Sequence, residues 1–189
     1  ELLEPVIAVH LLGAFYVTQP AWLIMREKGY GRVINTSSNS GILGNFGQAN
    51  YGAAKMGLVG FTRVLANEGR KYNIKANAIA PVAKTRMSEQ VPMELQMGEP
   101  EDVAPMAVYL LSDHAKHITG QVYTVNGPTI AVWNQPQEVR SMDNEGGGRW
   151  SPEQIAARID DGVGQERMGL IDRLEEYRKA AASGDKPNQ

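Results

Sequence analysis

The first 28 residues carry apolar side chains at helical spacing. From Val6 to Met25 these positions form a broad face of one helix. Pro5 is tolerated in a first helical turn, whereas Pro20, inside the pattern, predicts a kink. The pattern therefore predicts one long helix over residues 2–28.

Three short runs rich in β-branched residues alternate with further helical patterns. "GRVINTSS" predicts a buried strand at Arg32–Ser37, "NIKANAIAP" a strand that ends at Pro81, and "GQVYTVNGP" a third strand. Helices are predicted between them, over residues 49–72 and from Pro100 onward. Strands that alternate with helices imply an α/β fold with a parallel sheet covered on both faces.

The composition changes near residue 130, so the sequence predicts two regions, residues 1–130 and residues 131–189. The second region opens with the glycine run 146–148 and a capping box at 151–154, where serine precedes proline and glutamine. Its later part, about 165–182, predicts a charged helical tail that ends in a disordered terminus.

Composition excludes several kinds of protein. The 19 basic and 21 acidic residues are mixed along the chain, which argues against nucleic-acid binding. The absence of cysteine removes thiolate metal sites and favours a cytoplasmic location, and no metal site is predicted. The longest apolar run, Val6–Val17, is interrupted by His10 and is too short to span a membrane.

Tyr51 and Lys55 are the first candidates for chemistry. They lie four residues apart, so on a helix they share one face. A cation this close stabilises the phenolate, and Tyr51 can then act as a general acid or base near neutral pH. The spacing alone is weak, because residues that only pack together also produce it.

Ser38 adds a third group at the end of the first predicted strand, where parallel sheets place functional side chains. Its order with Tyr51 and Lys55 resembles that of the short-chain dehydrogenases/reductases. "VHLLGAFYVTQ", "GRVINTSS", "GNFGQANYGAAK", "NAIAP" and "ITGQVYTVNG" resemble segments of that family, in its order, over about residues 1–130. "GNFGQANY" and "EGRKYNIKANAIAP" most resemble its hydroxyacyl-CoA dehydrogenases, those of the peroxisomal multifunctional type 2 branch and their bacterial relatives.

This resemblance implies a Rossmann-type doubly wound parallel sheet and an NAD(P)-dependent oxidoreductase that interconverts a secondary alcohol and a ketone. Tyr51 would exchange the proton with the substrate oxygen, and Lys55 would assist it and hold the nicotinamide ribose. Ser38 would hydrogen-bond the substrate. His10 stands where most members have an asparagine that helps to hold a water in the proton path, so it is a catalytic candidate or a histidine that only packs in its helix.

The resemblance also assigns the residues after the second strand to the nicotinamide end of NAD or NADP. Members of the family have proline, glycine and then threonine there, whereas this chain continues from Pro81 without the glycine. The candidate cofactor contacts are Ala83, Lys84, Thr85 and Arg86, although Arg86 is equally compatible with a surface position.

Met87, Met93 and Met97 follow in a poorly periodic segment that resembles the family's substrate lid. Methionine adapts to irregular apolar ligands, so Met87 and Met93 are candidate contacts for an acyl-CoA-like or steroid-like substrate. The alternative is that these methionines only fill space in the protein core.

Gly52, Gly57 and Gly60 lie in the second predicted helix, where each costs about 1 kcal/mol relative to alanine. A close approach of another backbone is the expected compensation. The resemblance implies a homodimer or homotetramer through helices 2–28 and 49–72, and packing within one chain is the alternative.

The residues also lack a strand, glycine-rich turn and helix that would receive the cofactor pyrophosphate, and the glycines at 146–148 do not lie in such a pattern. We therefore expect a parent protein in which the cofactor-binding half, about a hundred residues, precedes Glu1. Two hypotheses follow: the catalytic half of an oxidoreductase for a 3-hydroxyacyl-CoA or a related steroid or acyl-carrier-protein substrate, or a non-catalytic dimerisation module.

Overall fold

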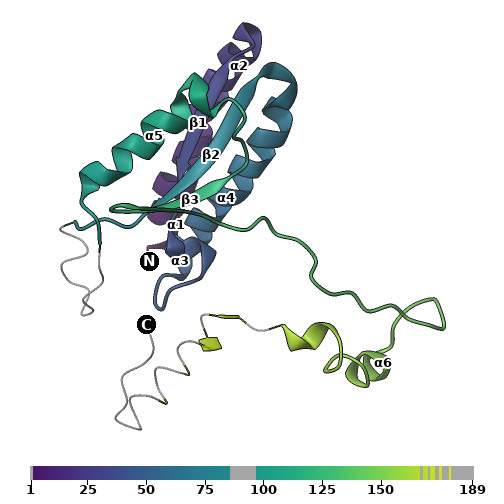
Figure 1. Cartoon of the computed structure of the whole chain (residues 1–189). Helices are drawn as coiled ribbons and strands as arrows, with labels where there is room; N and C mark the ends of the chain where they lie inside the picture. Colours follow the sequence, from purple (N-terminus) through teal and green to yellow (C-terminus); the bar gives the residue numbers. More distant parts are fainter. Residues whose placement is uncertain are drawn as a thin grey trace. The chain divides into compact units, whose positions relative to one another are not determined.

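The computed structural model describes residues 2–85 and 97–166, together with residues 168, 169, 171, 172, 175 and 179. The chain forms two units, Glu1–Gln135 and Pro136–Gln189. The first unit contains the sheet and the helices that cover it (Figure 1).

The sheet has four strands in the order β1, β2, β3, β4. Strands β1 (Gly31–Thr36), β2 (Ile74–Pro81) and β3 (Val122–Asn126) are parallel, and these are the three predicted strands. Strand β4 (Thr129–Val132) pairs antiparallel with β3 and was not predicted. All four of its residues are exposed, so it carries no alternation of apolar and polar positions. The three predicted strands are parallel as expected, and the additional strand β4 makes the sheet mixed.

One face of the sheet is covered by two long helical segments, both as predicted. The first comprises α1 (Leu3–Ile7), the π-helical turn η1 (Ala8–Leu12) and α2 (Gly13–Lys28). The second comprises α4 (Ala49–Gly69) and the 3₁₀ turn η2 (Arg70–Tyr72). Apolar side chains of α4 and β2 form a core on this face.

Pro20 was predicted to kink the first helix. It lies inside α2, which continues to Lys28. The irregular turn in the helix is η1, eight or more residues earlier, where the hydrogen bonding widens to the π pattern.

The opposite face of the sheet is covered by η3 (Pro100–Val103) and α5 (Ala104–Leu111), which together form the helix predicted to begin at Pro100. Met106 and Leu110 of α5 pack against Ile79 and Val125 of the sheet. Helices on both faces give the doubly wound arrangement. The short 3₁₀ turn η4 (Asp113–Ala115) follows α5.

The helix from Leu3 to Lys28 is long and apolar enough, by length and composition alone, to cross a membrane. Within the first unit it packs along β1 and α4 instead. Most of its large apolar side chains are exposed, among them Phe15, Tyr16 and Leu23. An apolar helix of this kind is also typical of a contact between subunits.

The second unit contains α6 (Pro152–Ala156) and the 3₁₀ turn η5 (Val163–Gln165). Ser151 Oγ accepts a hydrogen bond from Gln154 N and the Gln154 side chain accepts one from Ser151 N, as the predicted capping box requires. Most of the tail predicted over residues 165–182 lies outside the described residues.

Candidate active site

The site lies at the carboxyl end of β1, where the chain turns toward α4. Ser37 is buried: its backbone N donates to Ile79 O of β2, and its hydroxyl donates to Lys55 O at 2.9 Å. This pair of bonds fixes the end of the strand against both the sheet and the helix that carries Lys55.

Ser38 is half-buried and caps a short helix, α3 (Asn39–Ile42), which was not predicted. The backbone of Ser38 is extended, and its Oγ accepts a hydrogen bond from Ser40 N at 3.2 Å. The cap fixes the side chain at the strand end, beside the start of α4.

Two glycines let α3 lie directly on α4. A Cβ at Gly41 would be 2.7 Å from Met56 N, and a Cβ at Gly52 would be 3.0 Å from Ser40 O. Side chains at these positions would push α3, with Ser38, away from the turn of α4 that holds Tyr51 and Lys55.

Tyr51, Lys55 and His10 meet at this end of the fold. The Lys55 Nζ lies 5.5 Å from the centroid of the Tyr51 ring, and the His10 ring meets the same ring edge-on at 5.2 Å. Tyr51 N donates to the Asn50 side chain in the first turn of α4. The structure thus brings three of the four predicted catalytic side chains into contact, with Ser38 on the adjoining turn.

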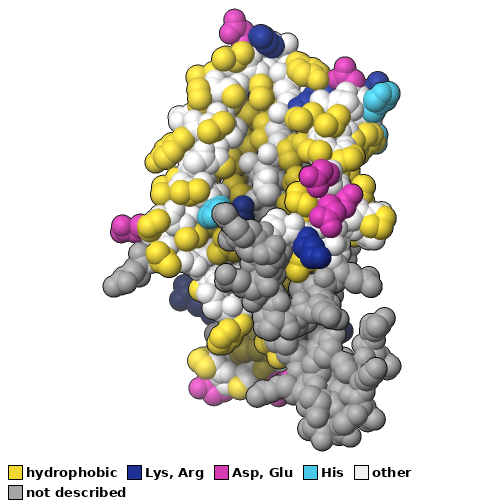
Figure 2. Space-filling view, turned by 90° about the vertical axis from the view of Figure 1, so that its left-hand side faces the viewer, with side chains coloured by type: hydrophobic (Ala, Val, Ile, Leu, Met, Phe, Trp, Pro, Cys, Tyr) yellow, Lys and Arg dark blue, Asp and Glu magenta, His cyan; other side chains and the backbone are white. Residues whose placement is uncertain are grey.

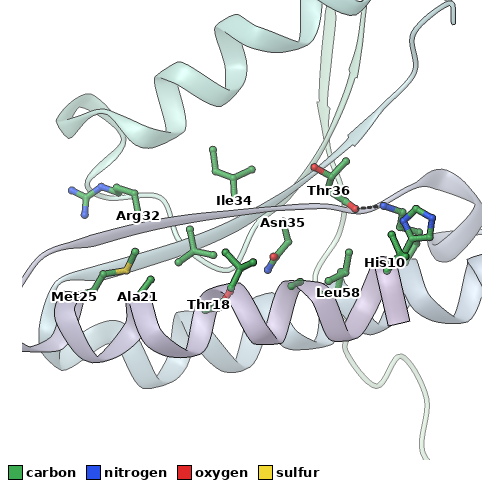
Figure 3. A pocket seen from close by; sticks show the side chains of 15 residues that line it. His10, Thr18, Ala21, Met25, Arg32, Ile34, Asn35, Thr36 and Leu58 are labelled. Carbon is green, nitrogen blue, oxygen red and sulfur yellow. Dashed lines mark hydrogen bonds between the residues drawn. The ribbon is translucent and has the colours of Figure 1, made fainter. Parts of the chain in front are cut away.

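Lys55 is only 7% exposed, which is unusual for an ammonium group. Its Nζ donates to Thr36 O at 2.8 Å, the bond drawn as a dashed line in Figure 3. Burial lowers the pKa of Lys55. The lysine is therefore held at the end of β1 with its charge directed at the site.

His10 lies in the π-helical turn η1 and is half-buried. Burial and the positive charge of Lys55 both lower the pKa of His10. The neutral imidazole is consequently favoured next to Tyr51, and it can accept a proton as well as donate one.

The candidate cofactor segment begins where β2 ends, at the same edge of the sheet. Val82 N donates to Val125 O, and Lys84 N donates to Gly98 O beside the bridge between Ala83 and Gly98. Lys84 and Thr85 are exposed. The remaining predicted contacts, Arg86, Met87 and Met93, lie outside the described residues.

The helix that Ser38 caps has a support that was not predicted from the sequence. Trp133, just after β4, packs with Ile42 against Val59 and Val122, and its Nε1 donates to Thr124 Oγ1 at 2.9 Å. Thr124 also donates to the Asn39 side chain at 3.4 Å. The only signal in the sequence was the Asn-Gly pair before β4, a common hairpin turn.

The three glycines of α4 do not share one role, and the alternative of packing within one chain holds for two of them. Gly52 faces α3, and a Cβ at Gly57 would be 3.0 Å from the side chain of Leu11 in the same chain. Only Gly60 has open space around it.

Comparison with known proteins identifies the family. Residues 1–127 match the family described as Enoyl-(Acyl carrier protein) reductase. The chain belongs to the short-chain dehydrogenases/reductases, as the resemblance in the sequence indicated.

Several curated relatives are 41% to 50% identical to the chain. A protein of Mycobacterium tuberculosis, described as a short-chain type dehydrogenase/reductase, is 44% identical over 82% of this chain and 54% of its own length. Mouse peroxisomal multifunctional enzyme type 2 is 50% identical over 59% of this chain and 16% of its own. Acetoacetyl-CoA reductase of Shinella zoogloeoides is 41% identical over 67% and 58%, respectively.

A solved structure, that of a short chain dehydrogenase from Mycobacterium avium, has a TM-score of 0.71 with the chain at 40% identity. The match covers 85% of this chain and 56% of that one, and it confirms the Rossmann-type fold. The chain thus spans about half the length of these two mycobacterial relatives.

Proposed function

We propose that the chain carries the acid/base half of an NAD(P)-dependent oxidoreductase that interconverts a secondary alcohol and a ketone. The observation that carries this proposal is the contact of Tyr51 with both Lys55 and His10 beside the capped Ser38. A buried ammonium near a phenol, at the carboxyl edge of a parallel sheet, suits proton transfer to or from a substrate oxygen.

Each residue has a distinct part in this proposal. Tyr51 gives its phenolic proton to the oxygen of a ketone or accepts the proton of an alcohol. Lys55 stabilises the phenolate electrostatically, because its ammonium is buried and held by Thr36 O. The Ser38 hydroxyl donates a hydrogen bond to the substrate oxygen, and His10 passes the proton between Tyr51 and solvent.

The described residues fit the nicotinamide end of NAD or NADP. Lys55 and Tyr51 offer donors for the nicotinamide ribose, and residues 83–85, whose backbone pairs with Gly98, offer contacts for the ring. The bound cofactor supplies a hydride donor or acceptor. Within residues 2–85 and 97–166 no glycine-rich turn joins a strand to a helix in the manner that a pyrophosphate requires, so that end of the cofactor needs further polypeptide.

A 3-hydroxyacyl-CoA or a similar apolar alcohol is the proposed substrate, with a steroid or an acyl-carrier-protein thioester as alternatives. One of the relatives supports a coenzyme A thioester, because it is named an acetoacetyl-CoA reductase. The absence of cysteine supports a cytoplasmic location.

A second candidate function is assembly, because one face of the helices is apolar and open. The rings of Phe15 and Phe61 stack 3.8 Å apart in a groove of about 500 Å³ that α2 and α4 share. We propose that this groove forms a homodimer contact. The assembly function alone leaves the contact among Tyr51, Lys55 and His10 unexplained.

The test is a chimaera in which the chain follows the part of the M. tuberculosis relative outside their alignment. We expect the chimaera to oxidise NADH or NADPH in the presence of acetoacetyl-CoA, and Tyr51→Phe to lower kcat by about a thousandfold with little change in nucleotide affinity. Tyr109→Phe, at an exposed position of α5, is the matched control. Turnover that survives Tyr51→Phe contradicts the proposed chemistry, and a folded chimaera that binds nucleotide without reducing the thioester contradicts the proposed substrate.

A further inference from the structure

The two ends of the strand order are exposed in different ways. At one end, β1 has an edge that pairs with no strand among the described residues, and Figure 2 shows a hollow strip on this side between two columns of hydrophobic side chains. At the other end lies β4, and all four of its residues are exposed. Because β4 buries no side chain, its value to the fold must lie in the residue that it leads to.

That residue is Trp133, directly after β4. Its backbone N continues the antiparallel ladder by donating to Val122 O at 2.9 Å. The Trp133 side chain is half-buried, whereas residues 128–132 before it and residues 134–135 after it are exposed. It packs against Val59 and Val122, as Ile42 of α3 does. The hairpin thus returns one large side chain to the apolar cluster on which α3 also rests.

Two hydrogen bonds join Trp133 to the helix that Ser38 caps. Trp133 Nε1 donates to Thr124 Oγ1 at 2.9 Å, and Thr124 Oγ1 donates to Asn39 Oδ1 at 3.4 Å. An indole nitrogen can only donate, so Thr124 is the acceptor in the first bond, and its single hydroxyl proton serves the second. Asn39 is the first residue of α3. The bonds therefore run in one direction, from Trp133 to the residue that follows Ser38.

The helix α3 needs support from outside itself. It has four residues and no buried side chain, so it is too short to be stable alone. Close contacts at Gly41 and Gly52 place it on α4, and the bond from Thr124 connects it to β3. These two supports come from different elements, and together they fix the orientation of the residue that caps the helix.

Strand β3 also holds the segment proposed for the cofactor. The Asn126 side chain accepts from Gly98 N at 2.9 Å, and Gly98 O accepts from Lys84 N at 2.7 Å. Thr124 and Asn126 are two residues apart, so their side chains lie on the same face of β3. One strand thus connects both to the helix that Ser38 caps and to the backbone of the cofactor segment, through separate hydrogen bonds.

We propose that Trp133 is a positioning residue of the candidate active site: through Thr124 and Asn39 it holds α3 so that the Ser38 hydroxyl faces the substrate oxygen. Ser38 Oγ accepts from Ser40 N, so a displaced α3 would misdirect the proton that Ser38 donates. The part played by Ser38 rests on the proposed function, whereas the position of α3 can be measured without turnover.

The first experiment measures amide hydrogen exchange in the full chain by NMR, which requires no catalysis. Two amides of α3 and its end report whether the helix is closed, because Ile42 N donates to Ser38 O and Leu43 N donates to Asn39 O. The reference is the Ser37 amide, which donates to the sheet and does not depend on α3.

Two substitutions interrupt the bonds while keeping the shape of each side chain. Trp133→Phe removes the indole donor, and Thr124→Val removes the hydroxyl. We expect each to speed exchange of the two α3 reporter amides by at least about tenfold and to leave the Ser37 amide within about twofold. Thr124→Ser keeps the hydroxyl and should restore slow exchange. Trp150→Phe makes the same change in the second unit and is the matched control.

The second experiment measures kinetics in the chimaera described above. Trp133→Phe should lower kcat by about tenfold and leave nucleotide affinity within about twofold, because the bond between Asn126 and Gly98 is retained. In a Ser38→Ala background, the same substitution should change kcat by less than about twofold, because the hydroxyl that Trp133 positions is gone. A tryptophan that only stabilises the fold would lower kcat by the same factor in both backgrounds.

Three results would overturn the proposal. The first is unchanged exchange of the α3 reporter amides in Trp133→Phe and Thr124→Val. The second is an equal acceleration of the Ser37 amide, which would indicate a general loss of stability. The third is an equal loss of kcat with and without the Ser38 hydroxyl. A chimaera without any turnover would contradict the proposed function instead, and the exchange rates alone would then decide whether Trp133 positions α3.

Discussion

At the residue scale, the proposed site contains ionisable side chains whose charged forms are costly to bury. His10 faces Tyr51 and Lys55, and its pKa is lowered by burial and by the lysine. As pH falls, the unfolded chain therefore binds the proton at its ordinary pKa of 6.5, before the folded chain does. Folding stability is lost in the interval from about 6.5 down to the lowered pKa of the folded state.

The first prediction concerns this histidine. His10→Asn should reduce the loss of unfolding free energy between about pH 7.5 and about pH 5, because the group that resists protonation is gone. Urea denaturation of the chain at both pH values measures it. His117→Asn, at an exposed position, is the control and should leave the loss unchanged. If the wild type and His10→Asn lost the same free energy of unfolding between the two pH values, the pKa of His10 would not be lowered in the folded chain.

A second prediction concerns the polar bond that ties β1 to α4. Thr62 is fully buried: its Oγ1 accepts from the Asn35 side chain at 2.9 Å and donates to Leu58 O at 2.7 Å. Thr62→Val keeps the shape but leaves the buried amide of Asn35 without this acceptor. We expect a loss of about 1–3 kcal/mol in unfolding free energy by urea titration. Thr129→Val, at an exposed position of β4, should change it by less than about 0.5 kcal/mol.

At the element scale, the sequence predicted the strands and helices whose buried faces leave a periodic pattern of apolar residues. The strands β1 to β3 and the two long helices were predicted because their apolar residues recur with the period of the element that buries them. The turn η1 and the helix α3 were not predicted. Neither differs from its surroundings in apolar period, and both are set by contacts with α4.

The candidate site, too, could be predicted only in part from the sequence. The spacing of Tyr51 and Lys55 and the position of Ser38 at a strand end were visible in the sequence. The buried bond from Lys55 to Thr36 O and the support of Trp133 behind α3 were not, because they join residues distant in the chain. The division of roles among the α4 glycines likewise required the three-dimensional structure.

The third prediction tests the fit of α3 on α4 with two Gly→Ala variants. Gly41→Ala should lower the unfolding free energy by about 1–3 kcal/mol, because its Cβ meets backbone atoms of Lys55 and Met56. Gly60→Ala has open space in the interior of α4 and should raise it by about 1 kcal/mol. Thermal or urea denaturation at low protein concentration measures both. Effects of the same sign would contradict the packing described for these two positions.

At the scale of the whole molecule, the first unit leaves two apolar surfaces on one long helix. The stripe of Val9, Gly13, Val17 and Ala21 faces the open edge of the sheet, whereas Phe15 and its neighbours face outward beside α4. Exposed apolar area of this extent is uncommon on a monomer. A second subunit on the outward face would bury part of this apolar helix.

The last prediction separates these two surfaces through the oligomeric state. Phe15 is 43% exposed and stacks on Phe61, so a carboxylate at this position would enter any contact between α2 and α4 of two subunits. Phe15→Asp should weaken self-association by about tenfold or more in sedimentation equilibrium. Phe46→Asp introduces the same change at a fully exposed position in the turn before α4 and should leave it unchanged. A chain that is monomeric at all concentrations would leave the outward face without a second subunit and would reject the dimer contact.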